Sequence, residues 1–240
     1  MTARPYSKTG PKGRKNVLQW YRIAGLKYPF TAFEDIMIKR TLLLSMVLAS
    51  GAAIAEGDPA KAKQTAETIC AGCHMADGNS MLPANPKLAG QVEEYLYKQL
   101  VDFKSGDRAS PVMGAMVATL SEDDMKDLAA YFAGQSLKPE SARNTDSLAA
   151  GQKMWRAGDM SKGIPACAGC HGPAGAGLPA QFPALSGQFA EYIETQVKAF
   201  RAGDRANDPS RMMRDIAIKM TDPEIAAVSD YAAGLRHQGQ

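Results

Sequence analysis

The pentapeptide Cys70-Ala-Gly-Cys-His74 recurs without change as Cys167-Ala-Gly-Cys-His171, and these two copies decide how the rest of the chain is interpreted. They contain all 4 cysteines of the 240-residue sequence, and each cysteine pair is followed directly by a histidine. The copies begin 97 residues apart, a separation typical of one small domain. An internal duplication is therefore the first organisation to consider, because a repeat fixes the architecture.

The sequence around the motifs is duplicated as well. At the same offset, the matching pairs include Pro86 with Pro183, Gln91 with Gln188, Tyr95 with Tyr192, and Arg108 with Arg205. After a three-residue insertion the offset becomes 100, where Tyr131 matches Tyr231. We interpret the chain as two copies of one domain, residues 56–138 and 147–240, joined by a linker at residues 139–146.

Each copy has the pattern of a small helical domain. A short helix leads into each motif, and a loop rich in Gly and Pro follows it, at residues 76–90 and 172–187. An amphipathic helix comes next, and a last helix opens with a capping box, Ser121-x-x-Asp124 or Thr221-x-x-Glu224. No convincing alternating strand pattern occurs in either copy. The predicted fold class is therefore all-α, with two tandem domains related by internal duplication.

The motif itself indicates covalent haem. In C-x-x-C-H, two thiols one helical turn apart can add across the two vinyl groups of haem, and the histidine is then placed against the iron. We therefore assign Cys70, Cys73, Cys167 and Cys170 to covalent attachment of two haem c groups, with His74 and His171 as proximal ligands.

Three other uses of the cysteines fit the sequence less well. A four-cysteine zinc site is opposed by the 93 residues between the pairs and by their placement in separate repeats. Redox dithiols usually lie on a strand–helix unit, which is absent here. Plain disulfides leave both histidines unexplained.

Methionine is the natural choice for the sixth iron ligand, since His237 is the one remaining histidine and lacks a counterpart in the first copy. We interpret His237 as a surface residue. Four other methionines of the two copies align with aliphatic residues, Met75 and Met81 have no counterpart, and only Met113 and Met213 coincide. These two are the predicted axial ligands. Pro86 and Pro183, with Leu88 and Leu185, are candidates for packing on the proximal haem faces, the alternative being that they only shape the loop.

The amino terminus carries an export signal. Residues 37–55 combine a basic start, a short apolar run and an Ala53-Ile-Ala55 cleavage site, which makes Glu56 the expected mature terminus. Residues 1–36 fit poorly before a signal, and we interpret them as a misassigned or disordered extension. Residues 56–240 carry 19 basic and 23 acidic residues, so no basic surface for nucleic acid is expected. The expected location is the periplasm.

With these residues assembled, the chain resembles the dihaem cytochrome c4 family. The resemblance rests on the two C-x-x-C-H motifs, the segments Pro86-Lys-Leu-Ala-Gly-Gln91 and Pro183-Ala-Leu-Ser-Gly-Gln188, and the Met-x6-Leu/Met segments that lead to Tyr131 and Tyr231. It implies two class I cytochrome c domains related by a pseudo-two-fold axis, with haem propionates facing the interface between them. Members of the family are soluble or loosely membrane-attached periplasmic carriers that deliver electrons to haem–copper terminal oxidases.

The expected function is accordingly electron transfer in a respiratory chain, between redox protein partners, without enzymatic activity. The main alternative is the dihaem subunit of an enzyme complex, such as a flavocytochrome sulfide dehydrogenase. A dihaem peroxidase or thiosulfate-oxidising enzyme is a third alternative. Such enzymes tend to need an open or unusually ligated iron, and the sequence has no spare cysteine or suitable histidine for that ligation.

Overall fold

The computed structural model describes residues 20–23, 26–29, 57–180 and 182–237. The predicted signal peptide and the expected mature terminus at Glu56 lie outside these residues. The chain divides into two units, residues 1–54 and 55–240. In the first unit, strands β1 (Trp20–Ile23) and β2 (Leu26–Pro29) form an antiparallel pair, which was not predicted from the sequence.

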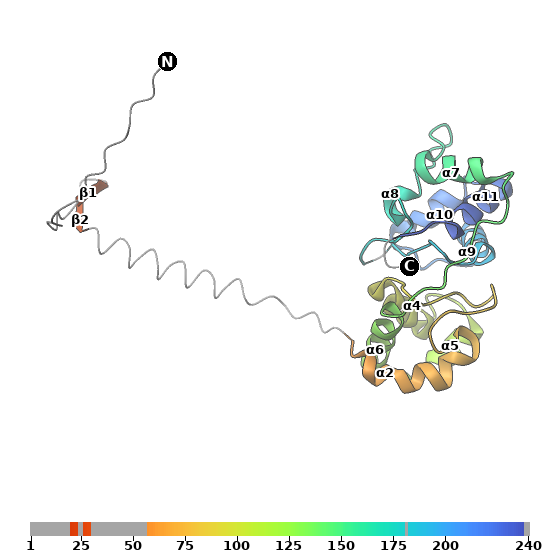
Figure 1. The fold of residues 1–240 in the computed structure, drawn as a ribbon, viewed down its shortest axis with the longest axis horizontal. Helices are drawn as coiled ribbons and strands as arrows, with labels where there is room; N and C mark the ends of the chain where they lie inside the picture. The colour runs from red at the N-terminus through yellow and green to blue at the C-terminus, as the bar shows by residue number, and fades with distance from the viewer. Residues whose placement is uncertain (1–19, 24–25, 30–56, 181, 238–240) are drawn as a thin grey trace, which may run out of the picture. The chain divides into compact units, whose positions relative to one another are not determined.

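Residues 57–180 and 182–237 fold into two groups of helices, one for each repeat (Figure 1). The helical segments of the first repeat are α2 (Pro59–Thr65), the π-helical turn η1 (Ala66–Cys70), α3 (Ala71–His74), α4 (Glu93–Ser105), α5 (Pro111–Val117) and α6 (Glu122–Ala133). Those of the second are α7 (Leu148–Ala157), α8 (Ala168–His171), α9 (Ala190–Ala202), the 3-10 turn η2 (Pro209–Arg211), α10 (Met212–Ala217) and α11 (Asp222–Ala233). The predicted all-α class is confirmed for both repeats, where the described residues add only two isolated β-bridges.

The helix starts follow from their capping residues. Ser121 accepts a hydrogen bond from the backbone N–H of Asp124, whose side chain accepts from the Ser121 N–H in return. Thr221 and Glu224 form the same capping box at the start of α11. Both predicted boxes are therefore present, and each satisfies backbone donors that would otherwise lack partners.

The approach to the motif differs between the repeats. In the first repeat, α2 runs through η1 directly into α3 and its histidine. In the second, α7 ends at Ala157, and Gly158 turns the chain at φ +66° into a loop closed by the Asp159–Ile164 bridge. A helix precedes the motif in both copies, as expected, but in the second copy the loop at residues 158–166 separates the two. The loop directs Ile164 into the interior, where it is fully buried.

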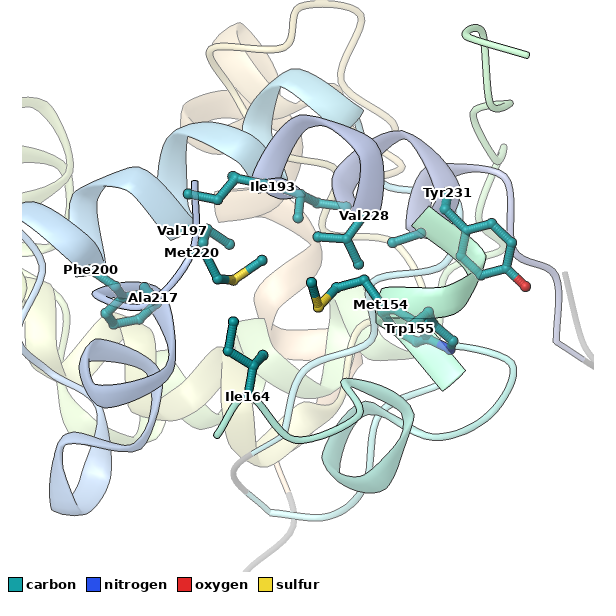
Figure 2. Packing of buried hydrophobic residues seen from close by; sticks show 12 residues of the cluster. Met154, Trp155, Ile164, Ile193, Val197, Phe200, Ala217, Met220, Val228 and Tyr231 are labelled. Atoms are coloured by element: carbon teal, nitrogen blue, oxygen red, sulfur yellow. The ribbon is translucent and has the colours of Figure 1, made fainter. Parts of the chain in front are cut away.

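Each repeat has its own hydrophobic core. In the first, Ala62 of α2, Leu96 of α4, and Leu128 and Phe132 of α6 come together. In the second, side chains from α7, α9, α11 and the loop around Ile164 converge (Figure 2). Among the described residues, no helix combines the length and the apolar character needed to cross a bilayer.

Candidate cofactor sites

The four cysteines of the motifs lie as two pairs in separate repeats, and none of them forms a disulfide. Burial raises the pKa of Cys70, and it raises that of Cys167 to about 11. Redox-active cysteines need a lowered pKa, so this environment weighs against a dithiol oxidoreductase. In the described part of the chain, no group of three or more His, Cys, Asp or Glu side chains could hold a metal ion, which weighs against the zinc alternative.

The two motif histidines are buried and held in a defined orientation. His74 and His171 are each 8% exposed. Nδ1 of His74 lies 2.9 Å from the carbonyl oxygen of Pro86, and Nδ1 of His171 lies 2.9 Å from that of Pro183. A carbonyl can only accept, so Nδ1 carries the ring proton and Nε2 is left free to bind a metal. Burial lowers the pKa of both rings and outweighs the opposing effect of these hydrogen bonds, so each ring favours the neutral form that ligation requires.

The prolines thus have a role beyond the packing that the sequence suggested. Pro86 and Pro183 follow their histidines by 12 residues in both repeats and present the carbonyl that orients each ring. Both prolines, together with Leu88 and Leu185, also line the cavity beside the histidines. The repeated spacing was visible in the sequence, but a backbone acceptor leaves no signature in residue type.

A single continuous cavity of about 970 Å³ is bordered by both motifs. Most of its lining side chains are hydrophobic, among them Leu96, Phe103 and Leu128 from the first repeat and Ile193, Val197 and Val228 from the second. A large apolar cavity bordered by two thiols and a histidine from each repeat matches the donor set and the surroundings that covalent haem needs.

Met113 and Met213 also line this cavity, as the axial-ligand prediction requires. Met113 lies in the first turn of α5, where its N–H donates to the Ser110 hydroxyl, and Met213 packs against the core of the second repeat. Met116, Met212 and Met220 border the same cavity. Geometry alone therefore does not single out the two ligands, and their assignment stays a prediction based on the repeat.

The cavity also meets a buried polar cluster between the repeats. Arg108 donates to Tyr192 Oη at 2.9 Å, and Arg205 donates reciprocally to Tyr95 Oη at 3.0 Å. Each guanidinium also bonds Gln99 and Gln196 and lies over a phenylalanine ring of its own repeat. The contacts are reciprocal, as a two-fold relation between the repeats requires.

This cluster has an excess of positive charge. Both arginines are 8% exposed, and within the described residues neither has a carboxylate at ion-pair distance. Burial raises the pKa of Tyr95, but the charges of Arg205 and Arg108 outweigh it, and the pKa falls. Buried charges are normally paired, so the cluster is suited to an anionic group in the cavity. The pairing of Arg108 with Arg205 in the repeat was visible in the sequence, but a pair of equivalent arginines does not by itself indicate a role.

His237 differs from its interpretation as a surface residue. Its ring is half-buried, and Nδ1 lies 2.7 Å from the hydroxyl of Ser186, a residue that is 2% exposed. Burial lowers the pKa of His237. The sequence could not indicate this contact, because it joins segments 51 residues apart.

Comparison with known proteins agrees with this arrangement. The family model for cytochrome c matches residues 59–136 and again residues 148–235. Cytochrome c4 of Pseudomonas aeruginosa is 45% identical over 197 residues, which cover 81% of this chain and 96% of that protein. The thiosulfate dehydrogenase electron acceptor of Stutzerimonas stutzeri is 41% identical over 180 residues, which cover 73% of this chain and 83% of that protein. The crystal structure of reduced recombinant cytochrome c4 from Pseudomonas stutzeri matches with a TM-score of 0.72 at 40% identity, over 75% of this chain and 100% of the other.

Two helical repeats of this kind, each with a C-x-x-C-H motif beside an apolar cavity, define a dihaem c-type cytochrome, an electron carrier. Its cofactors are two covalently bound haem c groups. Within that class, the chain belongs to the cytochrome c4 family, and the resemblance seen in the sequence is confirmed.

Proposed function

We propose a residue-level assignment of both haem sites. The first haem is attached to Cys70 and Cys73, with His74 and Met113 as axial ligands. The second is attached to Cys167 and Cys170, with His171 and Met213 as axial ligands. The observation that carries the assignment is the pair of buried histidines, each with Nδ1 fixed by a proline carbonyl and a methionine of the same repeat lining the shared cavity.

The protein residues control the properties of these sites. When bound, the haem supplies a one-electron iron couple. The proline carbonyls keep Nε2 of each histidine directed to the metal, and the apolar lining limits access of water. A thioether as the second ligand raises the reduction potential relative to two histidines, which suits a carrier late in a respiratory chain. Arg108 and Arg205 are the groups that we assign to the haem propionates, because they are buried cations with no carboxylate at ion-pair distance in the described structure, although the charge of Asp102 acts on Arg108.

The attachment proposal is tested by counting haems. A pyridine haemochrome assay against protein concentration should give two haems per chain that resist acid-acetone extraction. Cys73→Ser and Cys170→Ser should each retain two haems, but one of the two is then attached through a single thioether, which shifts its haemochrome band. Extractable haem in the unmodified protein would contradict the assignment.

We further propose that the chain is exported and acts in the periplasm. The support is the signal pattern of residues 37–55, which places mature Glu56 just before the first described helix of the haem domains. Intact-mass measurement of periplasmic protein should give a chain that starts at Glu56. A terminus upstream of Met37 would contradict this.

The partner that we favour is a membrane-bound haem–copper terminal oxidase. The second candidate partner is a sulfur-oxidising dehydrogenase, from which this chain would accept electrons. It is favoured by the 41% identity to the thiosulfate dehydrogenase electron acceptor. Stopped-flow mixing separates the two. The reduced protein should be oxidised rapidly by oxidase-containing membranes, whereas the second candidate predicts rapid reduction of the oxidised protein by thiosulfate with a purified thiosulfate dehydrogenase.

A further inference from the structure

Two equivalent glutamines connect the repeats through the backbone. Gln188 of the second repeat accepts from the Lys87 N–H at 3.0 Å and donates to the Lys87 carbonyl at 2.9 Å. Gln91 of the first repeat makes the same two bonds with Ala184, at 2.7 and 2.9 Å. Each glutamine therefore holds both backbone polar groups of one residue in the opposite repeat.

The residue that each glutamine holds is the one directly after the histidine-anchoring proline. The carbonyl of Pro86 and the N–H of Lys87 are the two ends of one peptide group. That group accepts from His74 at one end and donates to Gln188 at the other. The group between Pro183 and Ala184 joins His171 to Gln91 in the same way.

A peptide group that donates at its nitrogen becomes a better acceptor at its oxygen, because hydrogen bonds in a chain polarise one another. Lys87, Ala184 and Gln188 are each less than 9% exposed, so water competes little for these bonds. A stronger bond to Nδ1 makes a ligating histidine more electron-donating, and hydrogen bonding around the ligand set is a recognised control of haem potential.

We propose that Gln188 and Gln91 are positioning residues that act across the domain interface, each lowering the reduction potential of the haem in the opposite repeat through the proximal peptide group. The proposal rests on the assignment of His74 and His171 as iron ligands. It explains why the Pro-x-Leu-x-Gly-Gln segment occurs in both repeats: the proline serves its own haem site and the glutamine serves the other.

The test replaces each glutamine by the apolar residue of similar length. Gln188→Met, in the holoprotein, should raise the potential of the haem at Cys70 and Cys73, while Gln91→Met should raise that of the other haem. A threefold change in the equilibrium constant for reduction corresponds to about 28 mV, at ~59 mV per tenfold. The exposed Gln152 on α7 provides the matched control, because Gln152→Met should shift neither potential. Redox titration followed by NMR, with the haem methyl signals of each site resolved, measures both.

In this crossed pattern, each variant shifts the potential of the haem in the opposite repeat. A general loosening of the protein would not produce it. Equal shifts at both haems, a larger shift in the variant's own repeat, or no shift in a fully loaded protein would overturn the inference. A variant that binds two haems but lacks histidine ligation would instead contradict the site assignment. Should the methionine variants fail to fold, Gln188→Asn and Gln91→Asn keep the amide but shorten its reach. They should give shifts of the same sign, with faster amide hydrogen exchange at Lys87 and Ala184.

Discussion

At the residue scale, the axial methionines are the least constrained part of the site, since five methionines line one cavity. If Met113 and Met213 bind iron, both haems are six-coordinate and low-spin, and the ferric protein shows a weak far-red methionine-to-iron band. Met113→Ala or Met213→Ala should remove about half of that band and lower the potential at that site. Visible absorption spectra of the ferric protein measure the effect.

Neighbouring methionines give the controls for this prediction. Met116→Leu and Met212→Leu should leave the band intact, because the other repeat has aliphatic residues at both positions. Rapid carbon monoxide binding by the reduced unmodified protein would show that one iron has an open position, and the carrier assignment would then fail.

A second residue-scale prediction concerns Met75, which follows the first motif at φ +63° and ψ 157°. The equivalent residue in the second repeat is Gly172, at φ +80° and ψ 152°. This backbone region is nearly confined to glycine and costs other residues about 1–3 kcal/mol. Met75→Gly should therefore stabilise the protein by about 1 kcal/mol, after the ~0.5–1 kcal/mol entropic cost of glycine. Thermal unfolding of the holoprotein measures it.

Met81 supplies the matched control for Met75. It is 76% exposed and has no positive φ. Met81→Gly should therefore destabilise the folded protein slightly, because only the entropic cost of glycine applies there. Equal changes in melting temperature for the two variants would show that backbone strain at Met75 is not the cause.

At the scale of elements, the close contact of α7 with α11 depends on Gly151. A Cβ atom there would lie 2.2 Å from the carbonyl oxygen of Ala227 and 2.7 Å from Cβ of Tyr231. Gly151→Ala should force the helices apart and destabilise the second repeat by about 1–3 kcal/mol, because overpacking outweighs the better helix propensity of alanine. Denaturant unfolding of the holoprotein measures this.

Gly114 in α5 allows the same substitution without a clash, since its nearest neighbour would be the Phe103 carbonyl oxygen at 3.6 Å. Gly114→Ala should be neutral or stabilising by up to ~1 kcal/mol. A loss of stability as large as that of Gly151→Ala would count against the packing explanation.

An element could be predicted from the sequence when the residues that determine it lie close together in the chain. The capping boxes and the two motifs were predictable because each depends on a few residues close in sequence. The loop between α7 and the second motif was not, because the alignment of the repeats begins at the motif itself. The Gln188 and Arg205 contacts were also out of reach, because a repeat shows which positions are equivalent but not which side chains cross between them.

At the scale of the whole molecule, charge is distributed unevenly between the repeats. Residues 56–143 contain 9 basic and 13 acidic side chains, while residues 144–240 contain 10 of each, with haem propionates excluded. Long-range charge steers encounter more than it holds a complex, so a basic redox partner should approach the first repeat preferentially. The bimolecular rate with such a partner should fall as salt increases, because exposed charges are screened.

Stopped-flow kinetics over a range of ionic strength measure this rate, and an uncharged redox mediator serves as the control. A rate with the basic partner that stays flat between low and high salt would mean that the net charge of the first repeat does not guide docking.

The segment between α6 and α7 is fastened to both repeats. The Lys138 N–H donates to Asn79 of the first repeat at 2.6 Å, and the Glu140 N–H donates to the Gly187 carbonyl of the second at 3.0 Å. Short tethers raise the effective concentration of two joined modules to the millimolar range. The two haem domains therefore meet as an intramolecular pair, and the inter-repeat contacts of the two glutamines, the two arginines and Asn207 act at this high effective concentration. Domains cut apart within this segment should consequently separate on dilution to micromolar concentration, although each retains its haem.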